Sequence, residues 1–225
     1  MIFLILGGLL MLDYTEYQDN KIIKPTRLLV MIHGYGSNKN DLINVAPELS
    51  KFLPNTVFIA PSAPFSFEKI ANSELKQWFS FVDRSKNVLL DNMQIAGNII
   101  VDFIFFQLKK FNLSEDKLHL LGFSQGTILA LYITLQSLIR PKSVLGYSGR
   151  LFNHQWKCNN GKKVTKIILI HGKEDQIIPV EDMLSTIQML NQYGFYTQHY
   201  IQRHLAHGID KYGIITGAKF LQNNS

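Results

Sequence analysis

The chain has 225 residues, a length that suits one large domain or two small ones. Apolar residues make up 46% of it and charged residues 18%, a balance that excludes a disordered chain and allows a sizeable core. The formal net charge is +6, but apart from two lysine pairs the basic residues are spread singly. We therefore expect no nucleic-acid partner, because nucleic-acid binding concentrates basic residues into a patch.

The single cysteine and the N-terminal residues indicate in which cellular compartment the chain is expected. Cys158 has no second cysteine to pair with, so we expect a free thiol in a reducing, cytoplasmic setting. Residues 1–12 are nearly all apolar, but a membrane-spanning helix needs about 20 such residues. No positive leading segment or small-residue cleavage site precedes Asp13. We expect an extension over 1–12, either a gene-model artefact with Met11 as the true start or a weak membrane anchor, and one domain over 13–225.

Short apolar runs alternate with helix-length segments along the rest of the chain. The expected strands are 27–32, 56–60, 117–123, 142–147, 166–170 and 195–201. The expected helices are 41–52, 88–111, 125–139, 181–193 and 209–223. Because the strand runs are continuously apolar, they predict strands buried on both faces of a parallel sheet. The alternation predicts an α/β fold, a three-layer sandwich with a mostly parallel central sheet, and ligands meet such sheets at the carboxyl ends of the strands.

A G-x-S-x-G pattern ends the third run as Gly122-Phe123-Ser124-Gln125-Gly126. In this pattern serine occupies a tight strand-to-helix turn that holds its hydroxyl clear of the sheet. Glycine is needed on both sides because a side chain would collide with the neighbouring strand or the helix start. A buried-type strand precedes the pattern and a helix-forming run follows it, so we expect Ser124 to be a nucleophile. The alternative is a tight turn without chemistry.

A serine hydroxyl needs a base, which in this fold follows a carboxylate that itself follows the serine. Five of the seven histidines are set aside by chain order or by their place in or at the end of a strand: His33, His119, His154, His171 and His199. His204 and His207 remain, and His207 is favoured because it opens the last helical segment after the final strand. Glu174 and Asp175 both follow the fifth run and leave the acid open.

Acyl transfer also needs two backbone N–H groups for the negative charge that develops on the carbonyl oxygen. Gln125, which follows the nucleophile, is expected to supply one of them. The other is expected from the loop His33-Gly34-Tyr35-Gly36, which follows the first run. The alternative for this loop is a plain strand-to-helix turn.

Several motifs in order resemble the phospholipase/carboxylesterase family, which includes bacterial carboxylesterases and acyl-protein thioesterases. They cover the chain from about Arg27 to its end and comprise HGYGSN at 33–38, PSAP at 61–64, QWF at 77–79, GFSQG at 122–126, HGKEDQIIP at 171–179 and HGI at 207–209. Two positions depart from the family pattern: Thr127 and Ala206 stand where many relatives have glycine.

The resemblance implies a small α/β-hydrolase without metal or organic cofactor. It implies Ser124, Asp175 and His207 as the triad, backbone amides of Tyr35 and Gln125 as the oxyanion hole, and a substrate pocket bordered by the segment of Trp78 and Phe79. Core packing is the alternative reading for these two aromatic residues.

We therefore expect a carboxylesterase or acyl-thioesterase that acts on a small-molecule or lipid substrate, as a monomer or homodimer. Two alternatives stay open, a lysophospholipase in weak contact with a membrane surface and a catalytically silent binding module. The absence of a close His/Cys/carboxylate set or a phosphate-binding loop leaves metal and nucleotide enzymes without support.

Overall fold

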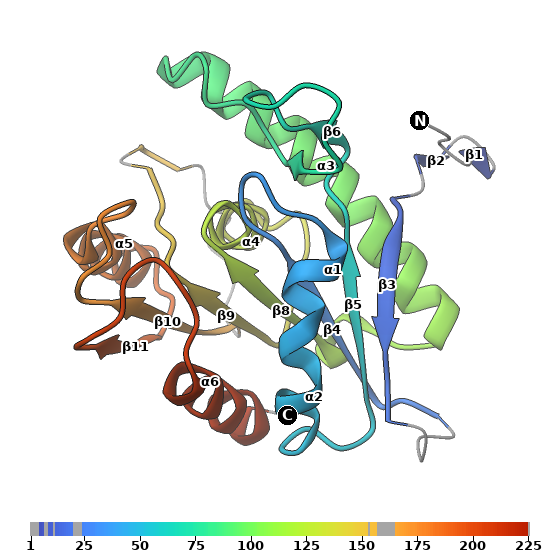
Figure 1. Cartoon of the computed structure of the whole chain (residues 1–225). Coiled ribbons are helices and arrows are strands. Elements are labelled where there is room, and N and C mark those ends of the chain that lie inside the picture. The colour runs from blue at the N-terminus through green and yellow to red at the C-terminus, as the bar shows by residue number, and fades with distance from the viewer. Residues whose placement is uncertain are drawn as a thin grey trace.

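A computed structural model describes residues 5–6, 9–10, 12–19, 24–152, 154–156 and 165–224 of the chain. Its centre is a seven-stranded sheet with the order β11-β10-β9-β8-β4-β5-β3 (Figure 1). In chain order these strands are β3 (Tyr14–Tyr17), β4 (Arg27–Ile32), β5 (Thr56–Pro61), β8 (Leu118–Phe123), β9 (Ser143–Tyr147), β10 (Lys166–Gly172) and β11 (Thr197–Gln202). Neighbouring strands are parallel except β3, which pairs antiparallel with β5.

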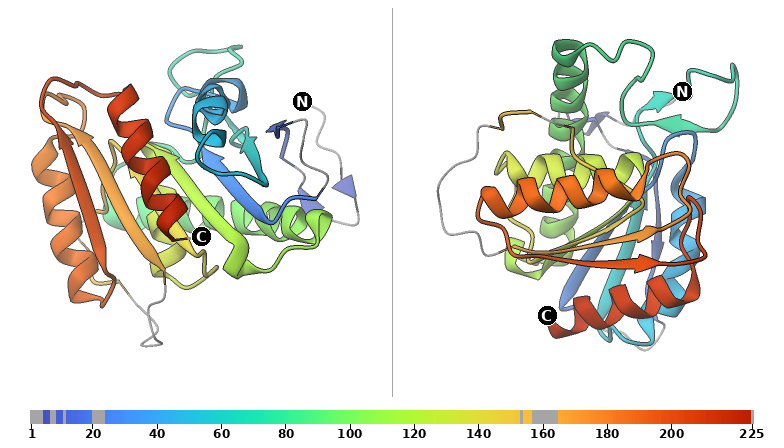
Figure 2. Two further views of the ribbon diagram at one scale, coloured as in Figure 1. Left: turned by 90° about the horizontal axis from the view of Figure 1, so that it is seen from below. Right: turned by 90° about the vertical axis from the view of Figure 1, so that its left-hand side faces the viewer.

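Helices cover both faces of this sheet, as Figure 2 shows. On one face lie α3 (Lys86–Phe111), α4 (Gln125–Leu135) and α5 (Val180–Gln192). On the other lie α1 (Lys39–Leu42), the 3-10 turn η1 (Ile43–Val45), α2 (Ala46–Ser50) and α6 (Lys211–Asn223). A second 3-10 turn, η2 (Glu115–Lys117), leads into β8. The expected three-layer α/β architecture is therefore present.

Two apolar cores fill the space between the layers. Because successive side chains of a strand point to opposite faces, Leu28, Val30 and Ile32 of β4 join the core under α3, α4 and α5. Leu29 and Met31 of the same strand join the core under α1, α2 and α6. Both sets are fully buried, which is why the run reads as continuously apolar.

The expected helix 41–52 is three short pieces, α1, η1 and α2. Pro47 stands at the start of α2, where its missing N–H is tolerated, but inside a longer helix the same residue would break the hydrogen-bond ladder. The sequence reading also missed β3 and the hairpin of β6 (Phe65–Ser66) and β7 (Lys76–Gln77), none of which carries an apolar run.

The N-terminal extension falls mostly outside the described residues, as does Cys158. Within it, β1 (Ile5–Leu6) and β2 (Leu9–Leu10) pair antiparallel. Among the described residues, α3 is long and apolar enough to cross a membrane by length and composition alone. Its inner side, including Met93, Ile100 and Ile104, is buried in the core, as in a core helix.

Candidate active site

Ser124 occupies the turn between β8 and α4 with backbone angles φ 52° and ψ −114°. A positive φ is rare for a residue with a side chain, because Cβ then crowds the backbone. The turn is held by its N–H, which donates to the Tyr147 oxygen at 2.9 Å. Such strain at a strand-to-helix turn is typical of a catalytic nucleophile and of functional sites generally.

The glycines around Ser124 are there because of close backbone approaches. A Cβ on Gly126 would lie 1.8 Å from the Ile32 oxygen of β4. A Cβ on Gly122 would lie 2.5 Å from the Thr127 nitrogen. No side chain fits at these distances, so the strand, the turn and the helix can meet only with glycine at both positions.

His207 and Asp175 come together at the carboxyl edge of the sheet, on the loops after β11 and β10. His207 Nδ1 lies 2.8 Å from Asp175 Oδ2, so its N–H donates to the carboxylate and Nε2 is left as a proton acceptor. Asp175 is buried, and its other oxygen accepts the backbone N–H groups of Ile177 and Ile178 at 2.9 Å each. The carboxylate is thereby held in one orientation before any substrate binds.

Two further contacts hold these loops next to each other. The N–H of Glu174 donates to the Leu205 oxygen at 3.0 Å, which links one loop to the other. Phe123, the residue before Ser124, lies with its ring centre 5.0 Å from that of His207. The loops that carry the expected nucleophile, base and acid are thus neighbours.

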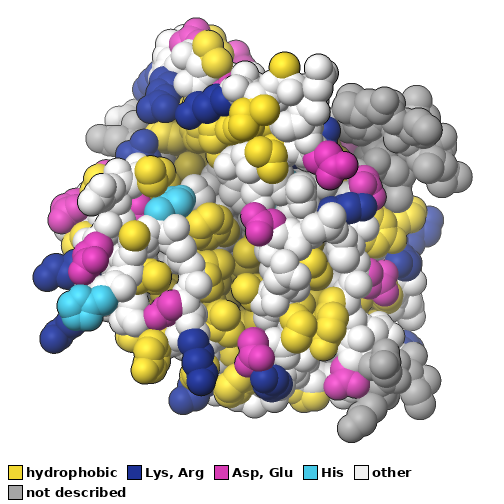
Figure 3. All heavy atoms as spheres, in the orientation of Figure 1, with side chains coloured by type: hydrophobic (Ala, Val, Ile, Leu, Met, Phe, Trp, Pro, Cys, Tyr) yellow, Lys and Arg dark blue, Asp and Glu magenta, His cyan; other side chains and the backbone are white. Residues whose placement is uncertain are grey.

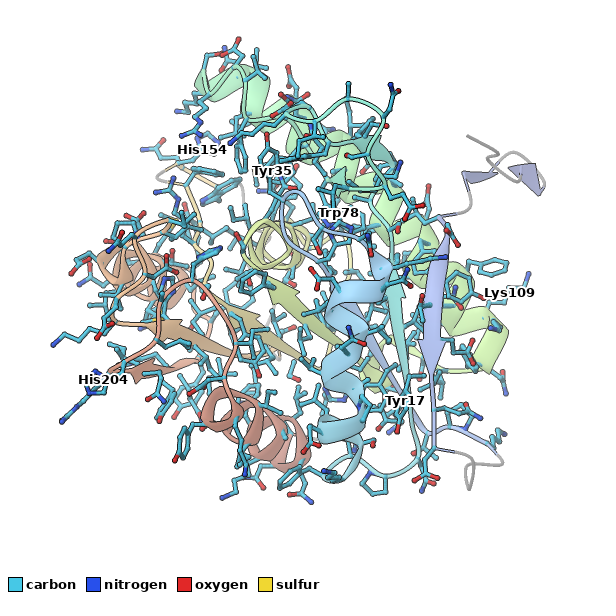
Figure 4. The ribbon with its side chains drawn as sticks, viewed as in Figure 1. Tyr17, Tyr35, Trp78, Lys109, His154 and His204 are labelled. Carbon is cyan, nitrogen blue, oxygen red and sulfur yellow. The ribbon has the colours of Figure 1, made fainter. Side chains whose placement is uncertain are left out.

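The alternative pair, His204 and Glu174, points away from this cluster. The two side chains contact each other at 3.2 Å, with 90% and 59% of their surfaces exposed. His204 projects outward at the edge of the molecule (Figure 4). The geometry therefore favours His207 and Asp175 over this exposed pair.

His171, expected as a structural turn residue, lies behind the acid and is fully buried. Its Nε2 is 2.8 Å from the Ile178 oxygen and 3.2 Å from Asp175 Oδ2. One N–H thus supports both the carboxylate and the loop that binds the other carboxylate oxygen. Sequence reasoning missed this contact, although its signal, a histidine four residues before the acid, is visible in the sequence.

The expected oxyanion loop follows β4 and is fixed by His33. Ala63 N–H donates to His33 Nε2 at 3.0 Å, so the ring proton is on Nδ1, which lies 2.7 Å from the Gly34 oxygen. Burial lowers the pKa of His33 to about 4, which keeps the ring neutral at neutral pH. Since the Gly34 oxygen and the Tyr35 N–H belong to one planar peptide, this bond also sets the direction of the Tyr35 N–H.

Trp78 and Phe79, expected at the substrate pocket, are almost fully buried. The indole N–H of Trp78 donates to the His33 oxygen at 3.0 Å, and its backbone N–H donates to Gln125 Oε1 at 2.9 Å. Gln125 Nε2 donates in turn to the Phe79 oxygen at 2.8 Å. The contacts that the structure gives these residues therefore support the expected oxyanion loop. That they border a substrate stays a prediction.

The side chain of Tyr35 is tied to the β6–β7 hairpin through Glu68, which the sequence analysis did not single out. The Tyr35 hydroxyl donates to Glu68, whose carboxylate also accepts from Gln77 and from the Phe81 N–H at 2.9 Å each. Burial works against ionisation of Glu68, but hydrogen bonds from Ser80, Tyr35 and Gln77 lower its pKa to about 2. An ionised carboxylate thereby connects the hairpin to the expected oxyanion loop.

This fold, with a strained serine turn and an adjoining His–Asp pair, defines a protein of the α/β-hydrolase class. The chain belongs to the phospholipase/carboxylesterase family, whose family model matches residues 18–225. Among the described residues, no group of three or more histidine, cysteine or acidic side chains gathers in a way that could hold a metal ion.

Similar proteins are named as an esterase, an acyl-protein thioesterase and a hydrolase. Esterase YpfH of Escherichia coli is 24% identical over 192 residues, covering 83% of this chain and 78% of that protein. Acyl-protein thioesterase 1 homolog 1 of Dictyostelium discoideum is 25% identical over 170 residues, covering 72% and 75%. An uncharacterized hydrolase of Mycosarcoma maydis is 23% identical over 148 residues, and the chain spans about half of its length, 49%.

Among solved structures, esterase PE8 superposes with a TM-score of 0.80 at 25% identity, covering 96% of this chain and all of that one. A hydrolase of the esterase and thioesterase type is therefore the class of enzyme to which the chain belongs.

Proposed function

We propose that the chain hydrolyses carboxylic esters or thioesters through an acyl-enzyme on Ser124, with His207 as base and Asp175 as its orienting acid. The observation that carries this proposal is the 2.8 Å contact between His207 Nδ1 and a buried Asp175 carboxylate, on loops adjoining the strained Ser124 turn. A serine is activated by a base in this way when the base is itself oriented by a third group.

In the first half of the reaction, His207 Nε2 takes the Ser124 hydroxyl proton while Oγ bonds to the acyl carbon. The carbonyl oxygen becomes an oxyanion, which receives the backbone N–H groups of Tyr35 and Gln125. The tetrahedral species then expels the alkoxide or thiolate, which leaves with the proton from His207. The product is the acyl-serine ester and a free alcohol or thiol.

In the second half, water attacks the acyl-serine while His207 accepts one of its protons. The oxyanion forms again at the same two N–H groups, and its collapse breaks the bond to Oγ. His207 returns the proton to Ser124 and the carboxylic acid leaves. Asp175 stabilises the imidazolium that forms in each half and stays ionised throughout.

The test compares hydrolysis of a p-nitrophenyl ester series, acetate to palmitate, and of the matching acyl thioesters by wild type and Ser124→Ala. Removing a triad member is expected to lower turnover by about 10⁴–10⁶. The matched control is Ser185→Ala, an exposed serine on α5 that should keep the wild-type rate. A serine-directed fluorophosphonate should label wild type at residue 124 and leave Ser124→Ala unlabelled.

Full activity of Ser124→Ala would overturn this nucleophile. A wild type that hydrolyses neither series and takes no label would favour the catalytically silent binding module. The ratio of ester to thioester rates assigns the leaving group.

A second candidate function is that of a lysophospholipase working at an anionic membrane surface. It is favoured by basic and apolar side chains in the segment 69–84, which contacts Tyr35. There Lys69 lies 5.5 Å from the Tyr35 ring centre and Arg84 5.5 Å from that of Phe81. Nearby apolar side chains are open to solvent, Val82 to 80% and Ile70 to 52%. Figure 3 shows basic and hydrophobic side chains gathered at the same end of the molecule.

Exposed apolar groups flanked by cations suit insertion into an anionic interface. If the chain is a lysophospholipase, its rate on lysophospholipid micelles should rise with their anionic lipid content. The same rate should be lower for Val82→Asp than for wild type. The same activity on neutral and anionic micelles would set it aside.

A further inference from the structure

A small cavity of about 200 Å³ lies between α1, η1 and the loops that carry the proposed catalytic groups. We name it the α1 pocket, and its apolar wall is made by Gly34, Leu42, Val45, Phe123 and Ile209. The sequence analysis assigned no role to Leu42, Val45 or Ile209.

Three of the loops that carry proposed catalytic groups contribute a wall residue within two positions of such a group. Gly34 precedes Tyr35, Phe123 precedes Ser124, and Ile209 follows His207 by two positions. A Cβ built on Gly34 would lie 3.4 Å from the Ser124 Cβ, so the backbone of this wall residue lies beside the nucleophile. The α1 pocket therefore adjoins the nucleophile and is within reach of a chain attached to the carbon that Ser124 attacks.

The volume limits what can enter. Pockets for drug-sized ligands run from about 300 to 1,000 Å³, and the α1 pocket is smaller than that. A water-sized group takes about 30 Å³ of liquid volume, so the space holds on the order of six such groups. A long fatty chain cannot be enclosed in this space, whereas a short one can.

The polar groups at the pocket already have partners and leave little demand for a polar ligand. Asp41 accepts the Ser37 hydroxyl at 2.6 Å. Both ring nitrogens of His33 are used, one by Ala63 N–H and the other by the Gly34 oxygen. What remains open to a ligand is the apolar wall, and an apolar chain gains free energy by leaving water for such a surface.

We propose that the α1 pocket binds a short apolar chain of the substrate, up to about six carbons, and that Val45 sets the limit of its length. The inference rests on the proposed esterase or thioesterase activity and narrows its substrate class to short-chain esters. The chain can belong to the acyl group or to the alcohol, and the two have the same chemistry for the pocket.

The experiment reduces and increases the volume of the α1 pocket by two substitutions at residue 45. Val45→Phe fills it and is expected to lower kcat/KM for p-nitrophenyl hexanoate at least tenfold while the acetate ester changes less than twofold, since one methylene in such a pocket is worth about 10–200-fold. Val45→Ala enlarges it and is expected to move the optimum to a longer chain. Val88→Phe, the same substitution at a partly exposed site on α3, should keep the wild-type profile.

A second series, acetate esters of methanol to hexanol, locates the chain, because only the series whose chain enters the pocket responds to residue 45. If neither series responds in folded Val45→Phe and Val45→Ala, the subsite is overturned while the proposed function stands. If Ser124→Ala keeps full activity, or wild type has none, the proposed function itself fails.

Discussion

The indole N–H of Trp78 donates a 3.0 Å hydrogen bond to the backbone oxygen of His33, the residue that orients the proposed oxyanion loop. The backbone N–H of the same tryptophan binds the side chain of Gln125, whose own N–H is the other proposed oxyanion donor. Trp78 therefore connects the two donors although it contributes neither. Both hydrogen bonds are buried, so removing one partner of either bond would leave the other partner as an unpaired polar group.

We predict that Trp78→Phe lowers kcat about tenfold and leaves KM nearly unchanged. The indole bond to His33 is worth about 1.4 kcal/mol in the transition state if it acts only through donor placement, which is tenfold in rate. The matched control is Trp156→Phe, because Trp156 Nε1 contacts Met189 Sδ at 3.2 Å and not the oxyanion loop. Steady-state kinetics on one ester, with melting temperatures for both variants, checks this. Equal kcat values in the two folded variants would contradict it.

The two histidine–carboxylate pairs allow a second prediction with an internal control. Asp175→Asn is expected to cost about 10⁴ in kcat because the amide favours the wrong imidazole tautomer at His207. Glu174→Gln and His204→Ala alter the exposed pair and are expected to stay within twofold of wild type. The four rates, with His207→Ala as the fourth variant, are measured side by side. A large loss in His204→Ala with full activity in His207→Ala would reverse the assignment.

Much of the scaffold could be predicted because its physics is local. A strand buried on both faces has to be apolar throughout, so each of the six expected strands is present with boundary shifts of a few residues. The G-x-S-x-G pattern likewise predicts its turn, since a Cβ at Gly126 would lie 1.8 Å from the Ile32 oxygen and only glycine fits there. The strand β3 was missed because Thr15 and Glu16 interrupt it, and it is an edge strand with only one neighbour.

What the sequence could not give is long-range pairing. The bond from Trp78 to His33 spans 45 positions and the bond from Trp78 to Gln125 spans 47. No spacing rule predicts such pairs, because they depend on how the chain between β5 and α3 folds back over the loop. For the same reason Glu68 stayed unnoticed, since a lone glutamate in a loop reads as a solvated charge until Tyr35 is placed beside it.

Buried neutral histidines give a third prediction, on the pH dependence of stability. Burial lowers the pKa of His33 to about 4 and that of His119 to about 3, against an ordinary value near 6.5. Between these values and pH 6.5 the unfolded chain binds protons that the folded chain does not. The free energy of unfolding therefore rises with pH in this window and falls on acidification.

Each such histidine contributes about 1.4 kcal/mol per pH unit well inside the window. Urea unfolding of wild type and His119→Asn between pH 4.5 and 6 measures the two slopes. We expect the variant's slope to be smaller by roughly that amount, because His119 is packed against Ser143 far from the catalytic loops and only its proton is lost from the balance. Parallel slopes would show that His119 is protonated in the folded protein.

The fourth prediction concerns Thr127, one of the two residues that depart from the pattern of the resemblance. Its hydroxyl donates to the Tyr147 oxygen at 2.8 Å, the same oxygen that accepts the Ser124 N–H. Its side chain also fills the space beside Gly149, where an added Cβ would lie 2.3 Å from the Thr127 Cβ. The threonine therefore braces the serine turn and makes glycine obligatory at position 149.

We predict that Gly149→Ala and Thr127→Gly are non-additive. Gly149→Ala alone should destabilise the wild type by about 1–3 kcal/mol through overpacking. Thr127→Gly alone should cost about 2 kcal/mol, from the lost hydrogen bond and from glycine inside a helix. The double variant should lose less free energy of unfolding than the two single variants lose together. The reason is that Thr127→Gly removes the closest clash of the new Cβ at position 149 and leaves only its 3.0 Å approach to the Ser124 oxygen. Urea unfolding of the four proteins closes the cycle, and strict additivity would mean that the turn relaxes away from Thr127 without cost.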